Sequence, residues 1–289
     1  MPHLKGDKAK QIRVKKQNSF AEMIKEDHIM PSHTSSEAIA KAFTDARLKG
    51  GSIRNYPGQV PEDLNEAYAI QDAAIKFWPQ DIAGWKIGGI GGDYAVRFNE
   101  IKLAGPVFGN QVYRDVGQTI DMPVFADGFA AIEPELVFIV KKDAPIDKTD
   151  WTIEEAKDYV GKVHIGVEIA SSPFPDINDM GPLVTISDFG NNNGLIIGEE
   201  LTSWHGSSLS DWTVETIIES KSVGTTTPPD PMTSFRFILE NTARRGMPLK
   251  KDMPITTGAI TGVHRAYSGQ TSTIKCSGAA DINLRLVDT

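Results

Sequence analysis

The chain has 289 residues, a formal net charge of −8 at pH 7 and a hydrophobic content of 40%. This composition is typical of a globular protein with a sizeable core, and it excludes wholesale disorder. The acidic balance argues against nucleic acid as the main partner, because phosphate binding requires a basic face.

Cysteine content and hydropathy exclude two further classes of protein, disulfide-stabilised and membrane-spanning ones. The single cysteine, Cys276, excludes an internal disulfide framework and any CxxC metal or redox motif. No apolar run approaches the roughly 18 residues of a membrane span, and the N-terminus carries no apolar signal segment. We therefore expect a soluble cytoplasmic protein without a membrane partner.

The N-terminal part of the chain divides into two regions. Residues 1–33 are basic and contain few large apolar side chains, which predicts a poorly ordered extension. Residues 34–80 have the apolar spacing of helices. One helix is predicted over 36–49, where Thr34 and Glu37 match a capping box.

A second helical pattern begins at Pro61 and ends before Pro79. It is followed, within 82–92, by a short predicted strand that carries Lys86 and by a glycine-rich loop. The glycines lack the G-x-G-x-x-G spacing of a dinucleotide site, and no βαβ unit surrounds them. We expect this loop to be pliable enough to cover a ligand.

The remainder, within a predicted catalytic core over 81–289, consists mainly of short apolar runs separated by Gly, Pro, Asn and Asp. This texture predicts a mostly β structure with few helices. The exceptions are predicted helices over 153–160, where Thr152 and Glu155 form a capping box, and over 231–245. The overall prediction is an α+β protein.

Two acids stand in one predicted strand. Glu133 and Glu135 are separated by a single residue at the start of an apolar run, so they must point to the same face with Cα atoms roughly 6.6 Å apart. Glu168 lies in another apolar run. If the two strands are neighbours, each carboxylate pair at about 4 Å would repel by about 4 kcal/mol at an effective dielectric near 20.

Such a cluster requires a cation or shared protons. Oxygen ligands suit a hard divalent ion, so we predict Mg²⁺ or Mn²⁺ held by Glu133, Glu135 and Glu168. Lys86 is the candidate for proton transfer or for holding a substrate carboxylate, with a pKa expected to fall near a cation. A simple ion pair with the carboxylates is the alternative.

Several segments, in order, resemble the 2-keto-4-pentenoate hydratase and 4-oxalocrotonate decarboxylase family of the fumarylacetoacetate hydrolase superfamily. The resemblance runs from about residue 67 to the C-terminus. The motifs that carry it are Ala67-Tyr68-Ala69-Ile70-Gln71, Gly84-Trp85-Lys86-Ile87-Gly88, Glu133 with Glu135, Val167-Glu168-Ile169, Ser187-Asp188 with Gly198, and Leu239-Glu240-Asn241 before Arg245-Gly246.

The resemblance implies a mixed, barrel-like β-roll with flanking helices, a metal on the three glutamates and a homo-oligomer. It implies a small anionic 2-oxo acid as substrate, with Lys86 facing it, and a lyase of the hydratase type in the catabolism of aromatic meta-cleavage products. The alternatives are a 4-oxalocrotonate decarboxylase, a C–C hydrolase of the fumarylacetoacetate or fumarylpyruvate type, and a non-catalytic binding protein.

Four further positions are substrate-binding candidates. Val107 and Phe108 stand where hydratases of the family write Pro-Asp-Phe-Gly, and the missing acid makes the segment more like that of the decarboxylases. Asp188 could orient a pocket group or cap a turn. Thr261, in a Gly-Ala-x-Thr segment, could offer a hydroxyl to the pocket. His164 shares a face with Glu168 and is interpreted as a core residue or an outer partner of the site.

Overall fold

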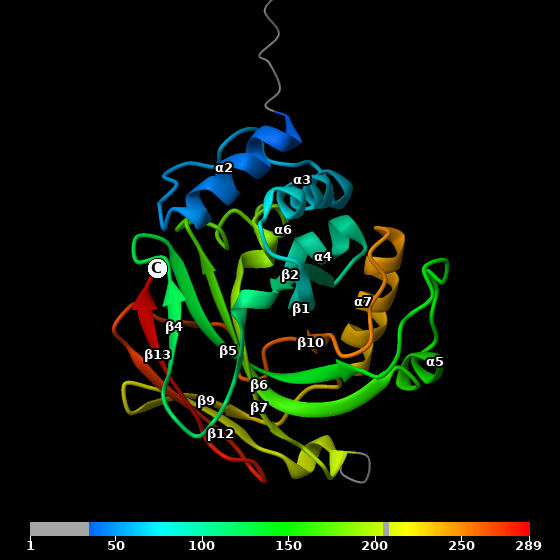
Figure 1. The fold of residues 1–289 in the computed structure, drawn as a ribbon, viewed down its shortest axis with the longest axis vertical. Helices are drawn as coiled ribbons and strands as arrows, with labels where there is room; N and C mark the ends of the chain where they lie inside the picture. The colour runs from blue at the N-terminus through cyan, green and yellow to red at the C-terminus, as the bar shows by residue number, and fades with distance from the viewer. Residues whose placement is uncertain (1–34, 205–207) are drawn as a thin grey trace, which may run out of the picture. The chain divides into compact units, whose positions relative to one another are not determined.

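The computed structural model describes residues 35–204 and 208–289 (Figure 1). Residues 35–289 form one compact unit. The basic segment 1–33 lies outside the described residues, so the prediction made for it stays a prediction. Within the described residues, no helix is long and apolar enough to cross a membrane.

The described strands form two sheets, as the β-rich texture predicted. In the larger sheet the hydrogen-bonded order is β2-β1-β10-β5-β6-β7-β3, and β11 pairs with β5. Its strands are β1 (Ile82–Gly89), β2 (Lys102–Phe108), β3 (Val112–Arg114), β5 (Phe129–Val140), β6 (Val160–Ser172), β7 (Asn192–Glu200), β10 (Pro254–Thr256) and β11 (His264–Arg265). Figure 1 shows β5, β6 and β7 as long, curved strands that run through the middle of the molecule.

The smaller sheet has the order β4-β13-β12-β8-β9. Its strands are β4 (Ile120–Val124), β8 (Val214–Ile218), β9 (Lys221–Thr226), β12 (Thr271–Cys276) and β13 (Ile282–Asp288). One hydrophobic core spans both sheets, with members such as Met122, Ile132, Ile165 and Leu284. The predicted α+β class with a curved, mixed β core is confirmed.

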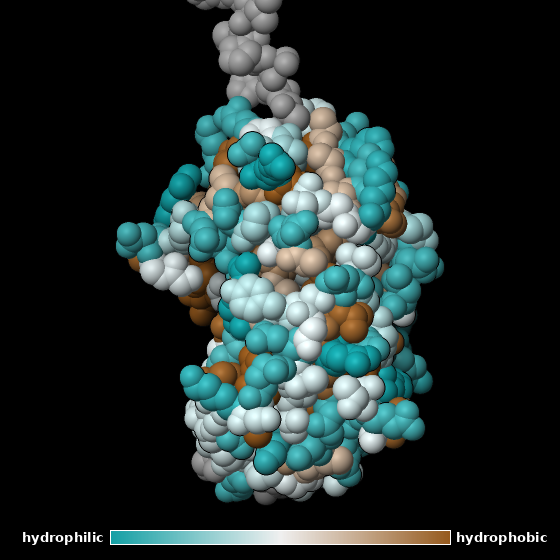
Figure 2. Space-filling model, turned by 90° about the vertical axis from the view of Figure 1, so that its left-hand side faces the viewer, coloured by the Kyte–Doolittle hydropathy of each residue, from teal (hydrophilic) through white to brown (hydrophobic). Residues whose placement is uncertain are grey.

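Helices cover one end of the larger sheet (Figure 1). They are α2 (Ser36–Leu48), α3 (Leu64–Phe77), α4 (Gly92–Phe98), α6 (Pro182–Ser187) and α7 (Met232–Arg244), while α5 (Ile153–Lys157) lies beside α7. On the face that Figure 2 shows, hydrophilic and hydrophobic residues are intermixed.

Most helix predictions hold, and the boundary errors have local causes. The second helix begins at Leu64 rather than at Pro61, because the Asp63 carboxylate caps it by accepting from the Glu66 N–H at 2.9 Å. The helix predicted over 153–160 ends at Lys157, since the chain enters β6 at Val160.

Two helices were not predicted. The glycine-rich loop after β1 leads into α4, which has no buried residue and so carries no strong apolar pattern. Helix α6 is short, and five of its residues, 183–187, are buried. Residues on or beside both helices line the cavity described below.

Candidate active site

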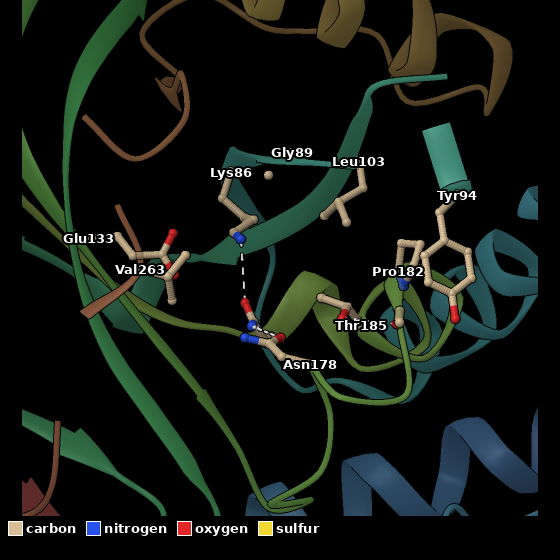
Figure 3. Close-up of a pocket in the computed structure, with 12 residues that line it drawn as sticks. Lys86, Gly89, Tyr94, Leu103, Glu133, Asn178, Pro182, Thr185 and Val263 are labelled. Carbon is tan, nitrogen blue, oxygen red and sulfur yellow. Dashed lines mark hydrogen bonds between the residues drawn. The ribbon is translucent and has the colours of Figure 1, made fainter. Parts of the chain in front are cut away.

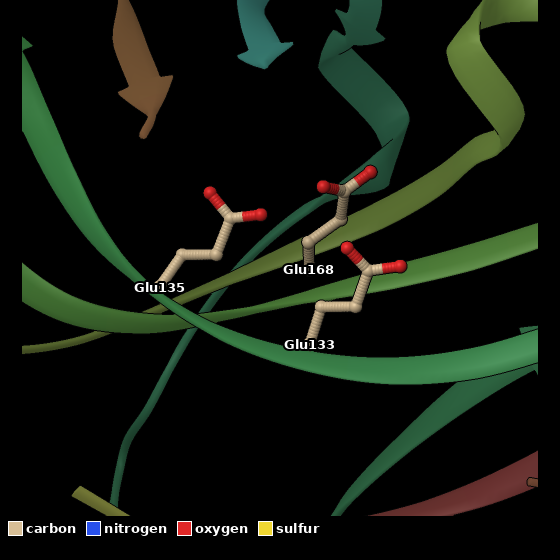
Figure 4. A group of neighbouring side chains, drawn as sticks. All are labelled: Glu133, Glu135 and Glu168. Atoms are coloured by element: carbon tan, nitrogen blue, oxygen red, sulfur yellow. The ribbon is translucent and has the colours of Figure 1, made fainter. Parts of the chain in front are cut away.

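The sheet register brings the three predicted glutamates together. Strands β5 and β6 are antiparallel neighbours, and Glu133 lies directly opposite Glu168. Glu135 lies on the same face as Glu133 because side chains alternate along a strand. One carboxylate oxygen from each residue lies within 4.8 Å of the others, and all three side chains are buried (Figure 4).

The carboxylates are only partly satisfied by protein donors. The Gly258 N–H donates to Glu135 Oε2 at 2.6 Å, and Asn192 Nδ2 donates to Glu168 Oε1 at 3.0 Å. Glu135 Oε1 and Glu168 Oε2 are buried without a hydrogen-bond partner. Unpartnered buried carboxylate oxygens are unfavourable, so this donor set fits a hard divalent cation.

Burial also shifts the protonation of the cluster. It raises the pKa of Glu133 to about 7, against the opposing charge of Lys86 and with the added repulsion of Glu168. Burial, followed by repulsion from Glu168 and Glu133, raises the pKa of Glu135 well above its usual range. The protein alone therefore disfavours three charged carboxylates at this place, and a bound cation would compensate for that.

Lys86 reaches the cluster from β1. Its Nζ lies 3.3 Å from Glu168 Oε1 and 3.4 Å from Asn191 Oδ1, and the residue is 3% exposed. Burial on its own would lower the pKa of Lys86, but the charges of Glu168, Glu133 and Glu135 outweigh it and raise this pKa. The fall was expected with a cation bound nearby, and for that state it stays a prediction.

Lys86 and Glu133 lie in the wall of a cavity of about 240 Å³ that opens to the surface (Figure 3). The remaining lining residues come from β1, α4, β2, α6, the loops beside α6 and the loop before β11: Gly88, Gly89, Tyr94, Leu103, Asn178, Gly181, Pro182, Thr185, Asn191 and Val263. The arrangement offers a small ligand a negatively charged metal-type site, one ammonium group and a mixed polar and apolar wall.

Comparison with known proteins relates this geometry to solved structures. No protein-family model matches the sequence, and no match is found among curated proteins. Two structures of 4-oxalocrotonate decarboxylase from Pseudomonas putida G7 align with TM-scores of 0.70 and 0.71, at 18% and 19% identity, over 87% of this chain and 97% of that chain. The first is complexed with calcium and acetate and the second with magnesium and adipate.

The chain has the fold of 4-oxalocrotonate decarboxylase. A fumarylpyruvate hydrolase from Pseudomonas aeruginosa, in complex with Mn²⁺ and pyruvate, aligns at TM-score 0.54 and 14% identity over 74% of this chain and 94% of that chain. The resemblance that the motifs indicated is thus confirmed at the level of the fold.

Within this decarboxylase fold, the four remaining predicted site residues do not line the cavity. Val107 and Phe108, both on β2, are buried in apolar clusters instead. The hydroxyl of Thr261 bonds Thr216 Oγ1 at 2.6 Å and His264 Nε2 at 2.8 Å. Asp188 is fully buried in an ion pair with Arg47.

His164 is satisfied by the backbone rather than by the site. Its Nδ1 lies 2.9 Å from the Gly198 carbonyl oxygen in the neighbouring strand β7, and the residue is buried. This contact supports its interpretation as a core residue.

Residues 188–193 form a turn that contacts Lys86 and Glu168, which the sequence did not indicate. Phe189, Gly190 and Asn191 are consecutive residues with positive φ values of 55°, 62° and 56°. Left-handed backbone is costly for phenylalanine, so the surroundings must hold this turn in place. Gly105 permits the close approach, because an added Cβ would overlap the Phe189 carbonyl. The turn delivers Asn191 to Lys86 and Asn192 to Glu168.

Arg47 of α2 stabilises that turn through several hydrogen bonds. Its guanidinium donates to both carboxylate oxygens of Asp188, to the Asn192 carbonyl at 3.0 Å and to Asn193 Oδ1 at 3.1 Å. A further bond reaches the Ser171 carbonyl at 2.9 Å. Sequence reasoning missed Arg47, since nothing local to α2 indicates a partner so distant in the chain.

We expect Arg47→Met to destabilise the protein strongly. The variant leaves Asp188 charged and buried without its partner, which typically costs about 3–5 kcal/mol. Denaturant unfolding of the metal-free protein measures the free energy. Arg285→Met is the matched control, because Arg285 pairs with Asp121 on the surface and its loss should change stability little. Equal effects of the two substitutions would contradict the role given to Arg47.

Proposed function

We propose that this protein is a divalent-metal-dependent lyase of the fumarylacetoacetate hydrolase superfamily that acts on a small 2-hydroxy-2,4-dienoate or 2-oxo-enoate. The hydratase type, in the catabolism of aromatic meta-cleavage products, is our leading assignment. One observation carries the proposal: three buried carboxylates, two with an unpartnered oxygen, stand beside a buried lysine at the wall of a small cavity.

Glu133, Glu135 and Glu168 would hold the ion, with Mg²⁺ or Mn²⁺ preferred because all ligands are oxygen atoms. The structural relatives named above carry magnesium, calcium or manganese, which supports this choice. When bound, the ion would supply positive charge that stabilises negative charge on the C2 oxygen of a 2-oxo acid.

The chain's own residues supply binding and proton transfer. Lys86 Nζ stands at the cavity wall between Glu168 and Asn191, so it can hold a substrate carboxylate or exchange a proton with the carbon chain. Asn191 restrains the ammonium group from the other side. Leu103, Pro182 and Val263 give the cavity an apolar part of its wall, against which the carbon chain of a substrate can pack.

A decarboxylase is the second candidate, favoured by the structural likeness to 4-oxalocrotonate decarboxylase. The sequence argument from Val107 does not decide between the two, because that side chain lies outside the cavity. A C–C hydrolase requires a base that activates water, and the described residues that line the cavity include no Glu–His pair.

Product analysis tests the proposal. The purified protein with Mg²⁺ is incubated with 2-hydroxypenta-2,4-dienoate in ¹⁸O-water, and separately with 2-oxohex-3-enedioate. A hydratase adds one labelled oxygen at C4 of the first compound, whereas a decarboxylase releases CO₂ from the second. Glu135→Gln controls for metal-only chemistry. No turnover of either compound above that control would contradict the lyase assignment.

A further inference from the structure

Arg245, which directly follows α7, joins that helix to α3 and β1. Its side chain is 9% exposed. The guanidinium donates from Nε and Nη2 to Asp72 Oδ1, and from Nη2 to Gln71 Oε1 at 2.7 Å. It also lies over two aromatic rings, 4.5 Å from the centroid of Tyr68 and 5.1 Å from that of Trp85. A charged group with so little exposure is therefore fixed in one place by both hydrogen bonds and ring contacts.

Arg245 determines how the amide group of Gln71 is oriented. A guanidinium has donors and no acceptor, so Gln71 must turn Oε1 toward Arg245 and Nε2 away from it. Nε2 then donates to two carbonyl oxygens, that of Ala104 on β2 at 3.0 Å and that of Ile186 on α6 at 2.8 Å. Gln71, Ala104 and Ile186 are all fully buried, so water cannot replace these bonds.

The two carbonyl groups belong to elements that form the wall of the active-site cavity. Leu103 directly precedes Ala104 and Thr185 directly precedes Ile186, and both Leu103 and Thr185 line the cavity (Figure 3). Gln71 is not among the lining residues, so it joins β2 to α6 from outside the cavity. The separation of these two parts of the wall therefore depends on one amide group.

A second bond from α3 supports the same point of β2. The Ala104 N–H donates to the Tyr68 hydroxyl at 3.0 Å, so both backbone polar groups of Ala104 are bonded to side chains of α3. On β1, the neighbour of β2, Trp85 directly precedes Lys86. Arg245 thus contacts β1 through Trp85, and it acts on β2 and α6 through Gln71.

We propose that Arg245 is a positioning residue for the reaction. By orienting the Gln71 amide, it holds β2 and α6 at the separation that places a substrate correctly against Lys86. This inference rests on the proposed function, because it concerns turnover in that cavity. The three glutamates lie on the other strands β5 and β6, so Mg²⁺ affinity should not depend on Arg245.

Arg245→Ala tests the inference, with Arg244→Ala as the matched control. Arg244 is the preceding residue in the chain, but its exposed guanidinium donates to the Thr149 carbonyl and to Glu240. Steady-state kinetics are measured below the unfolding temperature of each variant, with whichever of the two compounds named above the wild type turns over. We expect kcat/KM of Arg245→Ala to fall about 10–100-fold at unchanged Mg²⁺ affinity, and that of Arg244→Ala to stay near the wild-type value.

Added guanidinium distinguishes positioning from a purely structural role. A second cavity, of about 410 Å³ and open to the surface, is lined by Arg245, Tyr68 and Asp72 among others. The space left by Arg245→Ala would join this cavity, so a guanidinium ion can enter and bond Gln71 again. Guanidinium chloride, far below denaturing concentrations, should raise kcat/KM of Arg245→Ala several-fold, whereas sodium chloride at the same ionic strength should not. If guanidinium raises the unfolding temperature but not turnover, Arg245 is only structural and the inference fails.

Gln71→Glu tests the amide itself. The carboxylate still accepts from Arg245, but it presents an oxygen instead of an N–H group to the carbonyls of Ala104 and Ile186. This variant should lower kcat/KM as Arg245→Ala does, and guanidinium should not restore it. Hydrogen exchange followed by mass spectrometry should show faster exchange in β2 and α6 for both variants, with β5 unchanged.

The outcomes separate the inference from the proposed function. If the wild type turns over one of the compounds and either Arg245→Ala or Gln71→Glu does so equally well, the inference fails and the proposed function stands. Unchanged hydrogen exchange in β2 and α6 would also overturn the inference alone. If the wild type turns over neither compound, the proposed function fails and the inference fails with it.

Discussion

Glu135→Gln should lower the affinity for Mg²⁺ by about 100-fold or more. The substitution keeps the shape of the side chain but removes the charge from a fully buried carboxylate of the cluster, and replacing even an outer partner of a metal site typically costs 10–100-fold. Isothermal calorimetry measures the affinity. Glu154→Gln is the matched control, because Glu154 lies on the surface beside Lys157.

In the absence of metal, the same substitution should stabilise the protein. Because the pKa of Glu135 is raised above 4.5 in the folded state, the folded protein binds more protons than the unfolded one above that pH. Stability of the metal-free wild type therefore falls as the pH rises above 4.5 toward the folded pKa. Metal-free Glu135→Gln should melt at a higher temperature than metal-free wild type at pH 8. An unchanged Mg²⁺ affinity would refute the assignment of Glu135 as a ligand.

Lys86→Met should abolish most of the turnover while the metal remains bound. Loss of a positioned proton donor or acceptor typically costs about 10²–10⁴-fold in rate. The three glutamates stay in place, and removing a neighbouring positive charge does not weaken their attraction for a cation. Steady-state kinetics with 2-hydroxypenta-2,4-dienoate, together with Mg²⁺ calorimetry, measures both effects.

The same variant separates catalysis from a simple ion pair. If Lys86 only neutralises Glu168, then Lys86→Arg, which keeps the charge, should restore turnover. If Lys86 transfers a proton, then Lys86→Arg should remain slow, and added small alkylamines should raise the rate of Lys86→Met. Full activity of Lys86→Met would exclude both roles.

The metal-type cluster was largely predictable, because its information is local. The period of two in a β-strand places Glu133 and Glu135 on one face without knowledge of the fold. The contribution of Glu168 required a guess about which strands pair, and the register that sets it opposite Glu133 is a property of the whole sheet.

The residues of the cavity wall were less predictable, because their positions depend on contacts between distant parts of the chain. Asn191, which donates to Asn178, stands in a turn with three consecutive left-handed residues, and only one of the three is glycine. Val107 and Asp188 failed as cavity residues for a related reason. Each residue stands in a motif near the cavity residues in the sequence, but the direction of its side chain depends on packing in the folded protein.

The bond between Arg47 and Asp188 has a consequence for how the protein is made. The two residues are 141 positions apart, so α2 cannot acquire its partner until well over half of the chain has been synthesised. Until then, the apolar residues Ile39 and Phe43 of α2 can pack only against segments made earlier, such as Ile70 of α3. Contacts of such long range slow folding and leave a window for misassembly. Helix α2, which stands at the start of the described residues, is therefore fully secured only after Asp188 has been made.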